Sequence, residues 1–250
     1  MPTPISVFII TYNEDKIISK CLEKLFWANE IIVVDSGSID NTVSICKEFN
    51  AKVIYNKFED FGKQKQFALN QTKNEWVLSL DADEILSDEL IHEFKTFKPS
   101  NANGYFIKRT HVFLNKIFQY GAENKRPILR FFNKNKGYFI QNKIHEKIDV
   151  SGNLNQFTGE MLHYTVFDIS TAIQKQIKYA LLSGELFFEN NKKASLFKIS
   201  IKLPFEFIRV YFIQRNFLNG YEGFIWSIFA AFASFLKYVK LRDLQKSSKF

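Results

Sequence analysis

Residues 31–38 read Ile-Ile-Val-Val-Asp-Ser-Gly-Ser, and this stretch decides the fold. Its four consecutive β-branched residues predict a central strand that is buried on both faces. The strand ends on the carboxylate of Asp35, and the Ser-Gly-Ser that follows predicts a turn. This combination is typical of an open parallel sheet, in which ligands bind just beyond the carboxyl ends of the strands.

The alternation of strand and helix continues on both sides of this stretch. Short, mainly apolar runs predict strands at 5–10, 31–35, 52–55 and 76–80. Helical spacing of apolar residues predicts helices at 17–26, 40–49, 63–71 and 88–97, with Asp40 or Ser38, and Ser87, as caps. Further β-like pieces follow at 104–114, 128–132, 138–140 and 161–166, and a helix at 168–190. The pattern predicts an α/β fold with a mostly parallel central sheet.

The positive charge of the chain is concentrated near its C-terminus. The 250 residues carry a formal net charge of +8. Residues 1–191 hold 23 basic and 23 acidic side chains, whereas residues 192–250 hold 11 basic and 3 acidic ones. We therefore expect one α/β domain over 1–191, followed by a basic helical tail over 192–250. A chain of this length is too short for two full-sized domains.

Cysteine usage and the first residues bear on the cellular compartment. Cys21 and Cys46 each lie in a predicted helix, and no Cys-x-x-Cys pattern occurs. We expect both to be reduced, structural thiols. The chain runs from Pro4 directly into the first strand without the pattern of a secretory signal, so we expect a cytoplasmic protein.

Three of the four early strands end in a loop that bears a carboxylate. Thr11-Tyr12-Asn13-Glu14 follows the first strand, Asp35 ends the second, and Asp81-Ala82-Asp83 follows the fourth. Each segment alone also has a simple structural explanation. Thr11 and Asn13 could cap the following helix, Asp35 could cap a turn, and the Asp-x-Asp segment could be a solvated acidic loop. Together they converge on one edge of a parallel sheet, where two carboxylates suit a divalent cation that bridges to phosphates.

The order and spacing of these motifs resemble the family-2 glycosyltransferases of GT-A fold. The motifs that carry the resemblance are residues 9–14, 34–38 and 80–84, and it extends from about residue 5 to 165. Residues 28–38 and Phe61-Gly62-Lys63-Gln64-Lys65 more narrowly resemble the bacterial lipopolysaccharide-core β-glucosyltransferase subgroup. The resemblance implies a nucleotide-binding half over 1–100 and an acceptor half over 101–191. It also implies inverting transfer of a hexose from a nucleotide sugar, a UDP-sugar first of all, to a lipid-linked saccharide.

The resemblance also implies roles for individual residues. A nucleoside site would be formed by Thr11, Asn13, Glu14 and Asp35, with Lys63 nearby. Asp81 would lie near the ribose and the metal, and Asp83 would bind the divalent metal, Mn²⁺ or Mg²⁺.

Inverting transfer needs a general base for the acceptor hydroxyl. The family supplies a carboxylate well downstream of the Asp-x-Asp, and Glu146 in His145-Glu146 is the matching candidate. The alternative is an exposed alternating strand over 143–148 whose charges pair across the sheet.

Arg130 and His163 are further candidates. Arg130 could contact a diphosphate or an acceptor phosphate through its guanidinium fork, although arginines are also common on surfaces. His163 could complete the metal shell from a later strand, with a structural histidine as the alternative.

The tail interleaves aromatic and basic residues. Its longest uncharged run is Gly223–Leu236, 14 residues, which is shorter than the roughly 20 that a spanning helix needs. We therefore expect an anchor on the cytoplasmic face of the inner membrane, where a lipid-linked acceptor is presented. The alternative is that these helices pack on the domain or pair in a dimer.

Two other function classes compete with transfer. A sugar nucleotidyltransferase would need a glycine-rich, basic loop after the first strand, which Thr11-Tyr12-Asn13-Glu14 does not provide. A nucleic-acid-binding role for the tail lacks an RNP-like or zinc pattern, so we expect no nucleic-acid partner.

Overall fold

The computed structural model describes residues 3–122, 124–140, 147–166 and 168–247. The chain forms two compact units, one from residues 1–110 and 125–163 and the other from residues 111–124 and 164–250. We call the first the sheet unit and the second the helical unit. The expected boundary at residue 192 falls inside the helical unit, between α5 (Ile169–Glu189) and α6 (Leu196–Ile208).

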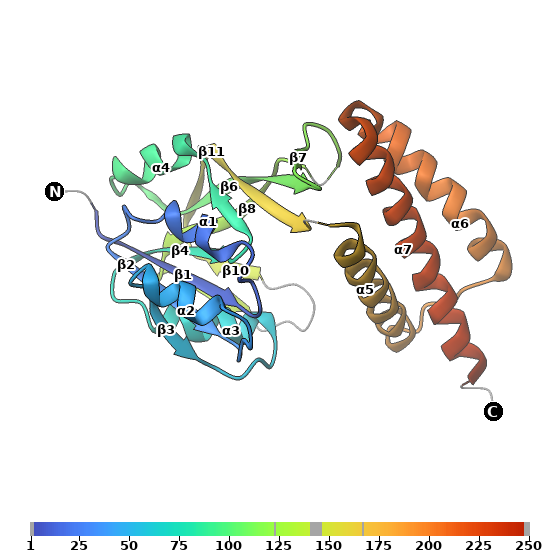
Figure 1. Ribbon diagram of the computed structural model, residues 1–250, viewed down its shortest axis with the longest axis horizontal. Helices are drawn as coiled ribbons and strands as arrows, with labels where there is room; N and C mark the ends of the chain where they lie inside the picture. Colours follow the sequence, from blue (N-terminus) through green and yellow to red (C-terminus); the bar gives the residue numbers. More distant parts are fainter. Residues whose placement is uncertain (1–2, 123, 141–146, 167, 248–250) are drawn as a thin grey trace. The chain divides into compact units, whose positions relative to one another are not determined.

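Four parallel strands form the N-terminal part of the sheet, as predicted. They are β1 (Ile5–Thr11), β2 (Glu30–Asp35), β3 (Lys52–Tyr55) and β4 (Trp76–Asp81), in the order β3-β2-β1-β4 (Figure 1). Their register pairs Thr11 with Asp35 and Ile10 with Asp81. The carboxyl ends of β1, β2 and β4 therefore lie at nearly the same level.

Helices cover both faces of these strands. The helices α1 (Ile18–Glu23), α2 (Thr42–Glu48) and α4 (Asp88–Lys95) contribute to the core on one face. The helix α3 (Phe61–Asn70) contributes to the core on the other face. Ser87 caps α4 by accepting a hydrogen bond from the Leu90 N–H, as predicted.

Antiparallel strands extend the sheet beyond β4. They are β8 (Arg126–Asn133), β6 (Ala102–Phe113), β11 (Asn153–Val166) and β5 (Glu84–Leu86), in that order. The short strand β7 (Lys116–Ile117) pairs with β6, and β9 (Gly137–Ile140) pairs with β10 (Lys147–Val150) in a separate two-stranded sheet. The β5–β11 pair matters for the site because it sets His163 opposite Glu84.

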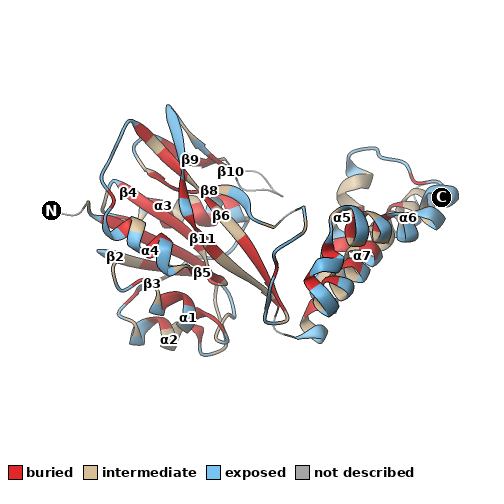
Figure 2. Ribbon diagram, turned by 90° about the horizontal axis from the view of Figure 1, so that it is seen from above, coloured by how far each residue is buried: buried red, intermediate tan, exposed pale blue. Residues whose placement is uncertain are grey.

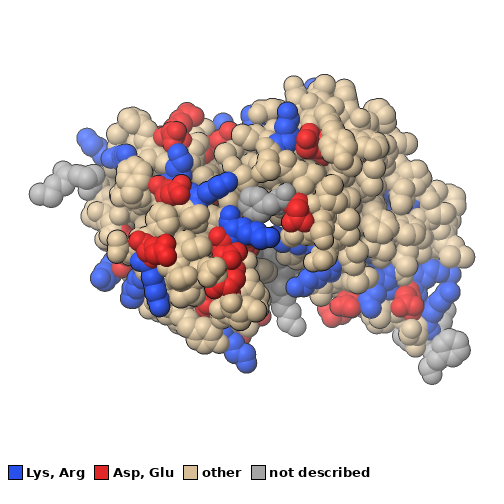
Figure 3. All heavy atoms as spheres, viewed as in Figure 1, with Lys and Arg blue, Asp and Glu red and all other residues tan. Residues whose placement is uncertain are grey.

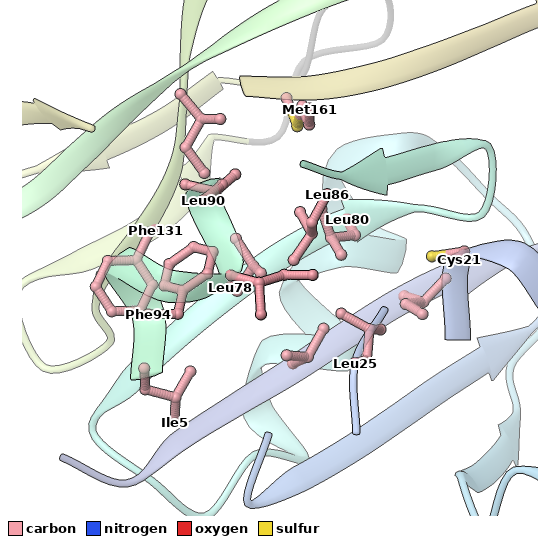
Figure 4. Packing of buried hydrophobic residues seen from close by; sticks show 14 of the residues in the cluster. Ile5, Cys21, Leu25, Leu78, Leu80, Leu86, Leu90, Phe94, Phe131 and Met161 are labelled. Carbon is pink, nitrogen blue, oxygen red and sulfur yellow. The ribbon is translucent and has the colours of Figure 1, made fainter. Parts of the chain in front are cut away.

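The alternation of side chains along β1 builds two cores. Ile5, Val7 and Ile9 belong to the core with α1 and α4, which Figure 4 shows in part, whereas Phe8 and Ile10 belong to the core with α3. Buried residues accordingly follow the strands of the sheet unit (Figure 2). The continuous apolar pattern predicted this burial on both faces.

The two cysteines are free and buried. Burial raises the pKa of the Cys21 thiol well above its ordinary value and that of Cys46 to about 11. A thiol that stays protonated at neutral pH is a poor nucleophile and a poor metal ligand, which agrees with the expected structural role.

The helical unit consists of α5, α6 and α7 (Gly220–Ser247) with two short turns between α6 and α7. These are a π-helical turn, η1 (Arg209–Ile213), and a 3₁₀ turn, η2 (Asn216–Asn219). Its core packs Phe113, Phe118, Val166 and Ala172 against Ile225, Trp226 and Phe229 of α7. The side chain of Asn219 also accepts hydrogen bonds from the backbone N–H groups of Gln119 and Tyr120.

The expectation that no segment of the tail is long enough to cross a membrane was wrong. In the described part of the chain, one helix, spanning Asn216–Ser247, is long and apolar enough to do so, with a mean hydropathy of 1.4 in its most apolar window. Only 22% of that window is buried. The uncharged run underestimated the helix because a span tolerates Lys near its ends, where the side chain reaches the interface.

Candidate active site

The candidate site lies at the carboxyl ends of β1, β2 and β4. The backbone register brings Thr11, Asp35 and Asp81 to this edge from three separate segments of sequence. The Thr11 hydroxyl is buried and has no hydrogen-bond partner in the part of the chain that the structure describes. A buried hydroxyl without a partner costs free energy unless a further group pairs with it.

Asp35 organises the turn that follows β2. Its Oδ2 accepts hydrogen bonds from the backbone N–H groups of Gly37, at 2.8 Å, and Ser38, at 2.9 Å. Its Oδ1 accepts one from the Ser38 hydroxyl, and the side chain is almost completely buried. Gly37 has φ +98°, which a residue with a Cβ rarely adopts. The predicted Asp turn is thus present, and it sets the backbone of this loop.

Asn13 joins the loop after β1 to the Asp35 turn. Its backbone N–H donates to the Ser38 hydroxyl at 2.8 Å, and its side-chain oxygen accepts from the Ile39 N–H at 2.9 Å. The backbone N–H of Glu14 donates to the Thr42 hydroxyl at 2.8 Å. Asn13 has φ +54°, a conformation that asparagine tolerates better than most residues. The two predicted nucleoside loops are therefore one connected structure.

Asp81 lies in a network of four charged side chains. Its carboxylate contacts the Lys65 ammonium at 2.8 Å and the Arg130 guanidinium at 2.6 Å. Arg130 also contacts Glu84 at 2.7 Å, and Glu84 accepts a hydrogen bond from the Asp81 N–H at 3.0 Å. Lys65 and Glu84 are completely buried.

The charges of this network determine the protonation state of Asp81. Burial alone would raise the pKa of Asp81. The neighbouring charges of Arg130 and Lys65 have a larger, opposite effect, and they hold this pKa well below its ordinary value. Asp81 is therefore a carboxylate at every physiological pH. Two cations and two carboxylates balance within the network, so its charge is neutralised by the protein itself.

Lys65 and Glu84 were not among the predicted site residues. A signal for Lys65 exists in the sequence, since it stands four residues before Leu69 and three before Ala68, both on the buried face of α3. A lysine on the apolar face of a helix points to a buried ion pair, because its charge is stable there only beside a carboxylate.

Asp83 and His163 face one another beside this network. His163 Nε2 lies 3.3 Å from Asp83 Oδ2, and each side chain is 19% exposed. Burial alone would lower the pKa of His163. The charges of Asp83 and Glu84 have a larger, opposite effect, so the pKa of His163 lies above its ordinary value. The structure thus brings together the two residues predicted to bind metal.

The residues present fit a divalent cation that is shared with a ligand. Among residues 3–122, 124–140, 147–166 and 168–247, no group of three or more His, Cys, Asp or Glu side chains could hold a metal alone. Asp83 and His163 supply one carboxylate and one imidazole. Mg²⁺ is commonly bound by one or two carboxylates together with substrate phosphates and water.

Lys63, Arg130 and Glu146 complete the account of the predicted residues. Lys63 lies on the surface, where its ammonium pairs with Glu59 at 2.6 Å. Arg130 is buried and directed at carboxylates of the protein, which differs from the predicted phosphate contact. Glu146 lies outside the described residues.

Comparisons with known proteins agree on one family. The family model described as Glycosyl transferase family 2 matches residues 6–153. A protein of Rhizobium meliloti, named lipopolysaccharide core biosynthesis glycosyltransferase LpsC, is 32% identical over 234 residues, covering 89% of this chain and 86% of that protein. An uncharacterized glycosyltransferase of Rickettsia typhi is 33% identical over 263 residues, covering 98% of this chain and 89% of the relative.

Two solved structures are similar to part of this chain, at lower sequence identity than these two relatives. Staphylococcus aureus TarS matches 84% of this chain and 44% of its own, with 20% identity and a TM-score of 0.49. Glucosyl-3-phosphoglycerate synthase of Mycobacterium tuberculosis, crystallised with Mn²⁺ and UDP, matches 44% of each chain with 22% identity and a TM-score of 0.35.

Proposed function

Because the chain belongs to glycosyl transferase family 2, we propose that it transfers a hexose, with inversion, from a UDP-sugar to a lipid-linked saccharide of the lipopolysaccharide-core type. The observation that carries this proposal is the convergence of Thr11, Asp35 and Asp81 on one sheet edge, with Asp83 two residues beyond the end of β4. The relative named for lipopolysaccharide core biosynthesis supports the acceptor class.

The loops after β1 and β2 receive the nucleoside in this proposal. The connected loops offer the buried Thr11 hydroxyl and the backbone around Asn13 and Glu14. Asp35 acts by holding the Gly37 turn in place, where a ligand can approach the backbone closely. Asp81, fixed as a carboxylate, accepts a hydrogen bond from a ribose hydroxyl, and Lys63 approaches from the surface of α3.

Asp83 and His163 would hold a divalent cation, Mn²⁺ or Mg²⁺. When bound, such a cation neutralises the negative charge that develops on the departing diphosphate. The protein contributes the Asp83 carboxyl group and an imidazole held 3.3 Å from it, while the two cations and two carboxyl groups of the Lys65–Asp81–Arg130–Glu84 network balance formally.

Glu146 is our candidate general base. In an inverting reaction the base accepts the proton of the acceptor hydroxyl as its oxygen forms a bond to the anomeric carbon. The bond from that carbon to the diphosphate oxygen breaks on the opposite face, and the nucleoside diphosphate leaves with the electron pair.

The helical unit associates with the cytoplasmic face of a membrane in this proposal. Large apolar side chains on α6 and η1, spaced by three or four residues, form one exposed stripe. This apolar stripe consists of Phe197, Ile201, Phe205, Ile208 and Phe212. Lys198, Lys202 and Arg209 each follow a residue of the stripe, and Figure 3 shows that much of this unit's visible surface is uncharged. Apolar side chains bordered by cations suit an anionic lipid surface.

The proposal is tested by following release of the matching nucleoside diphosphate (UDP, GDP or CDP) from a panel of UDP-, GDP- and CDP-hexoses with truncated lipopolysaccharide as acceptor. We expect turnover with one donor class, a mass increase of one hexose on the acceptor, and an inverted anomeric configuration by NMR. Pyrophosphate release from a nucleoside triphosphate, without sugar transfer, would instead support a nucleotidyltransferase.

A further inference from the structure

Two consecutive buried polar residues near the start of α3 contact both halves of the candidate site. Gln64 is 1% exposed and Lys65 is completely buried. In the sheet order β3-β2-β1-β4, the strand β1 separates β2 from β4. Successive residues of a helix point about 100° apart, so these two side chains diverge. Gln64 reaches the loops after β2 and β3, and Lys65 reaches the end of β4.

Gln64 uses its whole amide to hold two loops. Its Nε2 donates to the Ser36 hydroxyl at 3.0 Å and to the Asn56 carbonyl at 3.2 Å. Its Oε1 accepts a hydrogen bond from Asn56 Nδ2 at 2.7 Å. Ser36 directly follows Asp35, and the Asp35 carbonyl accepts from the Asn56 N–H at 2.9 Å. Gln64 thus fixes the start of the Asp35 turn through its hydrogen bonds to Ser36 and Asn56.

Lys65 holds Asp81 from the same helix turn. Its ammonium lies 2.8 Å from Asp81 Oδ1, while Arg130 occupies Oδ2 at 2.6 Å. The two contacts fix the carboxylate from both sides. Burying a lysine is unfavourable unless its charge is paired, and an apolar side chain would fill this interior position without that cost. The presence of a lysine therefore points to a requirement at Asp81 rather than in the core.

We propose that Gln64 and Lys65 are positioning residues that together hold the two halves of the nucleotide site in register. Gln64 acts through Ser36 on the nucleoside loop, and Lys65 acts through Asp81 on the ribose side. Both are buried, so they set donor affinity without contacting the donor. This inference rests on the proposed function and names two residues that its donor site requires.

The test compares Gln64→Leu and Lys65→Met with Gln66→Leu, a matched control on the same helix. Gln66 accepts a hydrogen bond from the Phe139 N–H at 2.8 Å, so it supports β9 rather than the loops after β1, β2 or β4. The measurement is the dissociation constant for UDP in the presence of Mn²⁺, by calorimetry, with Tm and circular dichroism for each variant. We expect Gln64→Leu and Lys65→Met each to weaken UDP binding by about tenfold, and Gln66→Leu to lower Tm with UDP affinity within about twofold of wild type.

A double-mutant cycle separates positioning from general destabilisation. If Lys65 acts through Asp81, Lys65→Met has little further effect on UDP affinity in an Asp81→Asn background. Folded variants that bind UDP as tightly as wild type would overturn the inference, as would an equal loss in Gln66→Leu. If Lys65→Met does not fold, Gln64→Leu against Gln66→Leu still decides the Gln64 half. Wild-type protein that binds no nucleoside diphosphate would instead refute the proposed function itself.

Discussion

His163 Nε2 lies 3.3 Å from Asp83 Oδ2, although 80 residues separate them in the sequence. The antiparallel pairing of β11 with β5 produces this proximity, since it sets His163 opposite Glu84, the neighbour of Asp83. The pair joins the Asp-x-Asp loop to the second half of the sheet unit. It is the structural basis of the proposed cation site.

Replacing His163 with alanine should raise the Mn²⁺ concentration needed for half-maximal activity by about tenfold or more, because one ligand is lost. His92→Ala is the matched control, since this histidine lies in the last turn of α4, and its Mn²⁺ requirement should equal that of wild type. A metal titration of UDP formation measures both. An unchanged requirement in His163→Ala would remove this residue from the cation site.

Asp35→Ala should both destabilise the sheet unit and weaken nucleotide binding. The carboxylate accepts three hydrogen bonds within its turn, and each bond to a charged group contributes about 1.5–3 kcal/mol before relaxation. We expect a loss of roughly 2 kcal/mol or more in the free energy of unfolding by urea. Ser38→Ala removes one of these contacts and should give a smaller loss. Equal stability of Asp35→Ala and wild type would contradict the role of this turn.

Glu206 should stabilise the helical unit in a pH-dependent manner. Burial alone would raise the pKa of Glu206. Hydrogen bonds from Arg209 and Lys202 have a larger, opposite effect, and they hold this pKa below its ordinary value of 4.5. The carboxylate therefore contributes stability above the unfolded-state pKa, and this contribution disappears as the pH falls through the lower folded-state pKa. Glu206→Gln should cost about 1 kcal/mol at pH 7, and this cost should shrink when denaturant unfolding is repeated at an acidic pH below the ordinary pKa of glutamate. A cost that is the same at both pH values would exclude an ionic contribution.

Membrane association should depend on the apolar stripe of α6 and η1. Phe197, Phe205 and Phe212 are 74%, 58% and 55% exposed, so changing all three to serine should leave Tm nearly unchanged. Vesicle affinity should fall by at least about tenfold, measured by co-sedimentation with phosphatidylglycerol-containing vesicles. Phe26→Ser, on the sheet unit and also 74% exposed, is the control. Equal binding by the triple variant would contradict a role for the stripe, and membrane fractions that resist alkaline carbonate would indicate a spanning α7.

The parallel half of the fold could be predicted because its signals are local. The short, mainly apolar runs marked β1 to β4, and parallel pairing then required Thr11, Asp35 and Asp81 to share an edge. The insertion of β8 between β4 and β6 depends on long-range pairing, which alternation within each strand does not specify. Family membership agrees with the resemblance found in the motifs.

The charged network was harder to predict than the strands. Asp81 and Arg130 were recognised as polar candidates, but their mutual contact depends on the antiparallel half of the sheet. The spacing of Lys65 from Ala68 and Leu69 indicates its burial, but its partner Asp81 follows only from the way α3 packs on the strands. The longest uncharged run in the tail underestimates the length of α7, because the helix continues through Lys237, Lys240 and Arg242.

The central claim is that Asp83 takes part in a metal-dependent nucleotide site, and thermal unfolding with UDP and Mn²⁺ tests it most directly. A ligand that binds only the native state raises Tm, and saturation at about 100 times Kd stabilises by about 2.7 kcal/mol. The account predicts that UDP with Mn²⁺ raises the Tm of wild type more than either ligand alone. In Asp83→Asn this extra rise should be absent, while the Tm of the ligand-free variant stays close to that of ligand-free wild type. The same Mn²⁺-dependent rise in Asp83→Asn as in wild type would contradict it.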